Sequence, residues 1–228
     1  KKLLIAAAVC LVLQTARDNV DFYRDKKVIT RGEMIAKMDT TQTKLTDIQK
    51  DQLQAMTGFK EKTSPEGKKK SMQKSLDKVR GDYAGFYEYQ SERSYNSEVK
   101  YLYFGLWDIL IFMFLGMAFY KSGILTGQAP VKTYWYLFIA GLGGGLVLYL
   151  LRLKPLIDYN FNFFEFTKNV KFEFYQISRT FRAVGIFGLI MLLYKSGWCK
   201  WFFSLMRPVG QMAFTNYLMQ SLLVGLFF

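Results

Sequence analysis

The residues of this chain that could do chemistry are charged and amide side chains inside long apolar segments. Asp108 lies about one third of the way along one such segment, and Arg179 and Arg182 stand three residues apart near the start of another. Charges inside a lipid bilayer are rare, tend to face the protein interior, and are candidates for function. We therefore expect Asp108 to meet one of these arginines in a polar cavity, which either serves a substrate or only locks helices together.

The last apolar segment carries amide and hydroxyl groups on neighbouring turns. Asn216 and Gln220 are four residues apart and share a helix face, with Thr215 beside them. Such groups need a partner in lipid, so we expect them to supply neutral hydrogen bonds to the same cavity. Arg207, before Pro208, is interpreted as a helix start and headgroup anchor, with an anion site at that helix N-terminus as the alternative.

Several kinds of chemistry are missing from the sequence. It contains no histidine, which removes a histidine base and imidazole metal ligands. Cys10 and Cys199 would lie near the centre and at the cytoplasmic end of different spans, and they predict neither a disulfide framework nor a zinc site, so no metal is expected. No phosphate-binding loop or dinucleotide motif occurs. If the protein is an enzyme, we expect its base outside these residues.

Five apolar segments are expected to place these groups in a membrane. A transmembrane helix needs about 20 mostly apolar residues, and four windows approach this length: 101–119, 133–151, 177–194 and 209–228. A shorter window, 3–16, is interpreted as a membrane helix cut at its start, with a signal peptide as the alternative. The predicted fold class is all-α, a polytopic bundle of transmembrane helices.

Lysines in the short connections predict the orientation of the bundle. Lysines occur at the start of the chain and in two short connections, and none of these three places contains an acidic residue: Lys1, Lys2, Lys121, Lys132, Lys195 and Lys200. Cytoplasmic loops are enriched in Lys and Arg, so we expect these lysines in the cytoplasm and residues 17–100 on the opposite side. The formal net charge of +13 then reflects membrane topology, and no nucleic acid is expected as a partner.

Residues 17–100 form a polar block with helical patterns. Thr46 predicts the N-cap of one helix, and Ser64 followed by Pro65 predicts the start of a second. The three lysines at 68–70 are interpreted as a solvated helix face, with lipid headgroups or an acidic partner as alternatives. We expect a helical extracytoplasmic excursion that lies on the membrane domain or docks an envelope protein. Its apolar positions recur on one helical face: Met72, Leu76, Val79, Tyr83 and Phe86.

Glycines gather in the middle of the span 133–151. Four of the five residues at 141–145 are glycine. Small residues let transmembrane helices approach closely. This cluster therefore predicts a packing surface for a neighbouring helix.

Three stretches of the sequence resemble a known family. They are Trp107–Gly123, Ser178-Arg179, and Arg207–Ser221, the last being the most specific. Together they resemble the C-terminal region of the YeiB family of bacterial membrane proteins, also called DUF418, over about residues 95–228. The resemblance implies a multi-pass inner-membrane protein with further helices outside these residues. It also implies kinship with membrane acyltransferases that use cytoplasmic acyl-CoA, and a loose link to transport.

The sequence thus predicts three regions: a membrane helix at 1–16, the polar excursion at 17–100, and a bundle of about four membrane helices at 101–228. Our first functional hypothesis is acyl transfer to an envelope glycan or small molecule, with acyl-CoA as donor. The polar residues named above would line its acceptor site or acyl tunnel. The alternatives are a transporter and a non-catalytic membrane subunit that docks an envelope partner. Membrane lipid and a homo-oligomer are the other expected partners.

Overall fold

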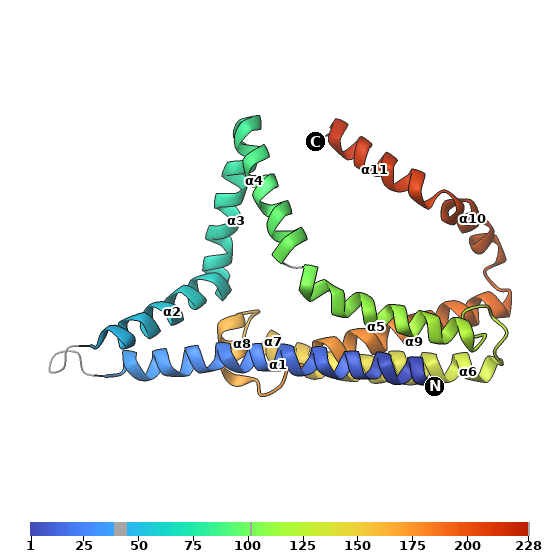
Figure 1. The fold of residues 1–228 in the computed structure, drawn as a ribbon, viewed down its shortest axis with the longest axis horizontal. Coiled ribbons are helices and arrows are strands. Elements are labelled where there is room, and N and C mark those ends of the chain that lie inside the picture. The colour runs from blue at the N-terminus through green and yellow to red at the C-terminus, as the bar shows by residue number, and fades with distance from the viewer. Residues whose placement is uncertain (39–44, 101, 228) are drawn as a thin grey trace.

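The structure, a computed structural model, describes residues 1–38, 45–100 and 102–227. Within these residues every regular element is helical and no strand occurs, which confirms the predicted all-α class. Figure 1 shows their arrangement. In chain order, with η marking π-helical segments, they are α1 (Lys2–Ala36), α2 (Asp47–Thr63), α3 (Pro65–Val79), α4 (Tyr83–Tyr95), η1 (Asn96–Lys100), α5 (Leu102–Lys121), α6 (Val131–Tyr136), η2 (Leu137–Gly143), α7 (Gly144–Asp158), α8 (Phe163–Asn169), α9 (Tyr175–Ser196), α10 (Lys200–Gln211) and α11 (Ala213–Phe227).

Membrane-length helices form the body of the protein. In the described part of the chain, three helical stretches are long and apolar enough to cross a membrane: α1, the continuous run Val131–Asp158 made of α6, η2 and α7, and α9. α5, with 20 residues, covers residues 102–119 of the further predicted span and packs along α1. These helices run side by side in Figure 1. The predicted polytopic helical bundle is therefore confirmed.

The glycine cluster packs against α9, as the sequence predicts. A Cβ atom added at Gly141 would lie 2.6 Å from the backbone nitrogen of Gly185, and one added at Gly145 would lie 2.8 Å from that of Arg182. Such distances leave no room for a side chain, so the two helices touch backbone to backbone. The small residues set the position of α9, which carries both candidate arginines.

The lysines of the short connections gather at one end of the bundle, here called the lysine end (Figure 1). It comprises the start of α1, the loop after α5, the start of α6 and the end of α9. The Tyr134 hydroxyl donates to the Ile124 carbonyl at 2.8 Å, and Lys195 Nζ donates to the Ala129 carbonyl at 2.5 Å. These bonds fix the loop after α5 against α6 and α9.

The first helix is longer than the predicted span 3–16, since it continues unbroken to Ala36. Its second half has apolar partners: Ile29 is fully buried against Met56 of α2 and Phe164 of α8. Lys168 Nζ of α8 also donates to Glu33 Oε1 at 2.6 Å, and this hydrogen bond raises the pKa of Lys168 above its ordinary value. Tertiary contacts thus extend the helix into the polar block.

The predicted helix starts in the polar block are confirmed. Thr46 precedes α2, and its backbone nitrogen donates to Gln49 Oε1 at 2.9 Å. Ser64 precedes Pro65 at the start of α3, and its hydroxyl accepts from the Gly67 nitrogen at 3.1 Å. These side chains satisfy backbone groups that the first turn of a helix leaves unpaired.

The single helical face predicted over residues 72–86 is broken in the structure. α3 ends at Val79 and α4 begins at Tyr83. Asp82 caps the new helix, since its carboxylate accepts from the Gly85 nitrogen at 3.1 Å. This cap, after a flexible glycine, favours a turn over a continuous helix.

The last predicted span, 209–228, is divided between two helices. α10 ends at Gln211, and the backbone leaves helical geometry at Met212 before α11 begins. Pro208 and Gly210 both weaken a helix at this point. α11 then runs from Ala213 to Phe227, the last described residue. Figure 1 shows α10 and α11 extending away from the bundle.

Candidate functional site

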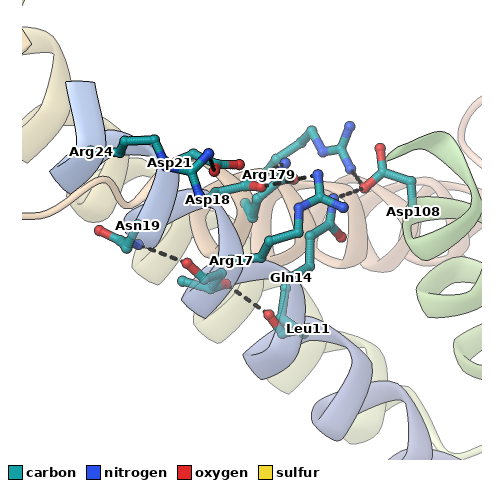
Figure 2. A network of polar contacts seen from close by, with 11 residues as sticks. Leu11, Gln14, Arg17, Asp18, Asn19, Asp21, Arg24, Asp108 and Arg179 are labelled. Carbon is teal, nitrogen blue, oxygen red and sulfur yellow. Dashed lines mark hydrogen bonds and ion pairs between the residues drawn. The ribbon is translucent and has the colours of Figure 1, made fainter. Parts of the chain in front are cut away.

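Asp108 of α5 and Arg179 of α9 form an ion pair between Asp108 Oδ1 and Arg179 Nη2 (Figure 2). Gln14 of α1 donates from Nε2 to the same carboxylate oxygen at 2.8 Å. Three helices therefore converge on one oxygen atom. The structure brings together Asp108 and an arginine, as the sequence predicts.

Aromatic rings border the guanidinium group of Arg179. Its Cζ lies 5.8 Å from the ring centroid of Tyr175, one helical turn earlier on α9. It also lies 5.8 Å from the ring centroid of Phe112, one turn after Asp108 on α5. Aromatic faces attract cations, so these rings add a second reason for the guanidinium to occupy this place.

α1 contributes a polar face that sequence reasoning missed. This helix carries Gln14, and three and four residues later it carries Arg17 and Asp18 (Figure 2). Arg17 Nη2 lies 3.5 Å from Asp18 Oδ1, and Gln176 Nε2 of α9 donates to Asp18 Oδ2 at 2.9 Å. We call the six residues Gln14, Arg17, Asp18, Asp108, Gln176 and Arg179 the polar cluster. The available signal was the spacing of 14, 17 and 18, which suits one helix face.

The other predicted site residues lie elsewhere. Arg182 Cζ lies 4.3 Å from the ring centroid of Tyr149, and its Nε donates to the Ser178 carbonyl at 3.4 Å. Asn216 Nδ2 donates to the Val209 carbonyl at 3.3 Å within its own end of the chain. Thr215 and Gln220 are exposed. Arg207 is exposed too, but it lies inside α10, which begins at Lys200, so the predicted helix start and the anion site at that helix N-terminus are wrong. The neutral amide at Asp108 therefore comes from Gln14, and the structure does not bring α11 to the cluster.

Several buried polar atoms around the cluster have no hydrogen-bond partner among the described residues. They are Gln14 Oε1, Trp107 Nε1, Gln176 Oε1, Arg179 Nε and Thr180 Oγ1. Buried polar groups in proteins are nearly always paired, and each unpaired group costs about 1–3 kcal/mol. A bound molecule with polar atoms would satisfy them.

An apolar pocket of about 400 Å³ lies beside the polar cluster, between α1, α5, the α6–η2 region and α9. Leu4 and Tyr136 line it towards the lysine end, and Leu11, Ile111 and Thr180 line it towards the cluster. Thr180 is 6% exposed and directly follows Arg179 of the cluster in α9, and its hydroxyl has no hydrogen-bond partner among the described residues. The arrangement fits an amphipathic molecule, with an apolar chain in the pocket and a polar group at the cluster.

Asn19 fastens α1 to the segment that leads into α9. Asn19 Nδ2 donates to the Glu173 carbonyl at 3.1 Å, and the Glu173 nitrogen donates to Asn19 Oδ1 at 2.9 Å. Glu173 also pairs with Arg152 of α7, whose Nε lies 2.7 Å from Glu173 Oε1. This network connects α1, α7 and α9 next to the cluster.

Asn19→Ala is expected to lower the free energy of unfolding by about 2 kcal/mol, because it leaves both backbone groups of Glu173 unpaired. Asn169→Ala is the matched control, since Asn169 is exposed and bonds only within α8; its effect should stay within about 0.5 kcal/mol. Unfolding in detergent, followed by circular dichroism, measures both. Equal effects would contradict a specific role for Asn19.

The fold and the site define a class: a polytopic α-helical membrane protein with a charged cluster between its helices. Residues 119–228 match the model of a family described as a protein of unknown function, DUF418. This match confirms the resemblance to DUF418 over those residues, which are just under half of the chain. No curated protein and no solved structure matches it. The matched residues include Arg179 and Thr180, whereas Gln14 and Asp108 precede them.

Proposed function

We propose that this chain is the membrane part of an acyltransferase, which receives an acyl chain in the apolar pocket and presents it at the polar cluster. The observation that carries the proposal is Thr180, a buried hydroxyl without a partner among the described residues, which lines the pocket and directly follows Arg179 in α9. An acyl group is apolar along its chain and polar at its carbonyl. The Thr180 hydroxyl would donate to that carbonyl, and the cluster would orient the acceptor.

The direction of the pocket suits a cytoplasmic donor. Its lining extends from Leu4 to Leu11 along α1, which corresponds to about 10 Å of helix. The positive-inside rule places the lysine end in the cytoplasm of a bacterial inner membrane. An acyl-CoA would supply the activated acyl group, and its coenzyme A would leave as the free thiol when the acyl group passes to the acceptor. The polar cluster then faces the outer half of the membrane.

Transport of a polar solute is the weaker alternative. A polar solute crossing the bundle needs hydrogen-bonding groups along its path. The pocket between the lysine end and the cluster is lined almost entirely by apolar residues, with Thr180 and Tyr136 carrying its hydroxyls. An apolar chain suits this lining better than a polar solute does.

The proposal predicts that filling the pocket weakens acyl binding. Ala8 lines the pocket, whereas Val12, one turn later, is 66% exposed and does not. Ala8→Phe should weaken binding of a radiolabelled long-chain fatty acid to the purified full-length protein by at least about tenfold, or 1.4 kcal/mol. Val12→Phe should bind like the wild type. Equal binding by the two variants, both monodisperse, would contradict the proposal.

A further inference from the structure

A second hollow lies outside the bundle, in the segment formed by α2, α3 and α4. It is a groove of about 1130 Å³, lined by the end of α2, most of α3 and two residues of α4. Six cationic side chains and two carboxylates line it: Lys60, Lys62, Lys68, Lys70, Lys74 and Arg93, with Glu61 and Glu66. The groove is therefore strongly positive and fits an anionic ligand.

Contacts with α8 fix one wall of this cationic groove. Lys68 Nζ lies 3.8 Å from the ring centroid of Phe163, and Lys60 Nζ lies 5.7 Å from that of Phe164. These two lysines have aromatic partners. Lys70 and Lys74 stand one turn apart on α3, and neither forms an ion pair among the described residues. Their charges remain for a ligand that the groove admits.

The cationic groove lies near the point where the chain enters the bundle. In Figure 1 the α3–α4 hairpin turns away from the long direction of the bundle, and α4 leads through η1 to the start of α5. Arg93, a groove residue, precedes the first residue of α5 by nine positions, or about 14 Å of helix at most. A membrane-spanning α5 would place this position close to the lipid headgroups around its start.

α4 also has the composition of a helix at a membrane surface. Its exposed aromatic residues include Tyr83, Tyr87 and Tyr95, which are 80%, 65% and 62% exposed. Tyrosine rings prefer the headgroup layer, where one end of the ring is apolar and the other is hydrated. Basic residues beside them add attraction to anionic lipids.

We propose that the cationic groove binds the phosphate headgroups of anionic membrane lipids. The bilayer around α5 supplies phosphate groups at the level of the groove, and the exposed tyrosines of α4 lie where they can enter the headgroup layer. An anionic lipid headgroup offers both a charge for Lys70 and Lys74 and a glycerol surface for the rings. This binding site is independent of the acyl pocket.

The test is titration of the full-length protein, in a neutral detergent, with short-chain phosphatidylglycerol, and native mass spectrometry to count bound lipid. The variant Lys70→Gln/Lys74→Gln should bind about 30-fold more weakly, or about fivefold for each lysine near a phosphate. Lys37→Gln/Lys69→Gln removes the same charge outside the groove and should bind like the wild type. The variant Lys70→Arg/Lys74→Arg should retain binding.

Three results would overturn the proposal: equal binding of short-chain phosphatidylcholine, an equal loss in the control variant, or no loss in Lys70→Gln/Lys74→Gln. Inorganic phosphate is tested as a competitor. Competition at the same concentration as the lipid would show a site for free phosphate and would also overturn it. Because the groove variants leave Ala8 and the pocket unchanged, failure here is distinguishable from failure of the acyl-binding proposal.

Discussion

Asp108→Asn is expected to lower the free energy of unfolding by about 3 kcal/mol, because the guanidinium of Arg179 then loses its ion-pair partner inside the bundle and keeps only the charge of Asp18, with which it forms no ion pair. The control is Asp21→Asn on α1, whose ion pair with Arg24 is largely exposed; its effect should be at most about 1 kcal/mol. Unfolding of the purified protein in detergent, followed by circular dichroism, measures both variants.

The double variant Asp108→Asn/Arg179→Gln separates a charge effect from a packing effect. It removes both charges, so it should recover most of the stability that Asp108→Asn loses. If the double variant is as unstable as the sum of the two single variants, the ion pair does not exist in solution. If Asp108→Asn instead stays stable and monodisperse but loses acyl transfer, that result would support a role for Asp108 in binding an acceptor.

Gly141→Leu is the second variant with a large expected effect, a loss of about 3 kcal/mol in the free energy of unfolding. The new side chain would collide with the backbone of Gly185 on α9, and overpacking of a tight contact costs about this much. The contact also positions Arg179, so the polar cluster would be displaced along with α9.

Gly143 provides a matched control for this prediction. It lies two residues away in the same helical run, and a Cβ atom added there has no neighbour within 4 Å. Gly143→Leu should change the free energy of unfolding by about 0.5 kcal/mol or less. Similar losses for Gly141→Leu and Gly143→Leu in detergent unfolding would contradict the backbone contact between η2 and α9.

Much of the membrane domain could be predicted from sequence, because lipid imposes strict rules. Apolar length predicts the helical spans, and glycine predicts the surface that meets α9. The need to pair a charge in lipid predicts that Asp108 meets an arginine. The choice of Arg179 depends on tertiary packing, since Arg182 faces the ring of Tyr149 instead. The spacing of residues in the sequence does not specify the contact between Arg182 and Tyr149.

The contribution of α1 could not be predicted in the same way. Arg17 and Asp18 resemble the end of a span, so the predicted helix stopped at residue 16. The helix continues because α2 and α8 cover its second half, and this cover comes from segments more than 20 residues away. The polar face with Gln14 therefore became visible only in the folded chain.

For the last predicted span, the sequence predicts a contact that the fold does not make. The polar residues of 209–228 share a helix face, and that pattern predicts a partner inside the bundle. The break at Met212 separates α11 from α10, and Thr215 and Gln220 of α11 are exposed. The low helix propensity of Pro208 predicts that the helix is weakened near this residue. The direction of the chain after it depends on tertiary contacts, which the spacing of residues in the sequence does not specify.

Photo-crosslinking with a diazirine-bearing fatty acid, applied to the full-length protein in membranes, tests the central proposal most directly. Peptide mass spectrometry then locates the labelled residues. We expect labels on the α1 peptide with Leu11 and the α9 peptide with Thr180, and their loss in Ala8→Phe. Labelling confined to exposed residues outside the pocket, such as Val12, and unchanged in Ala8→Phe, would contradict an acyl site beside the polar cluster.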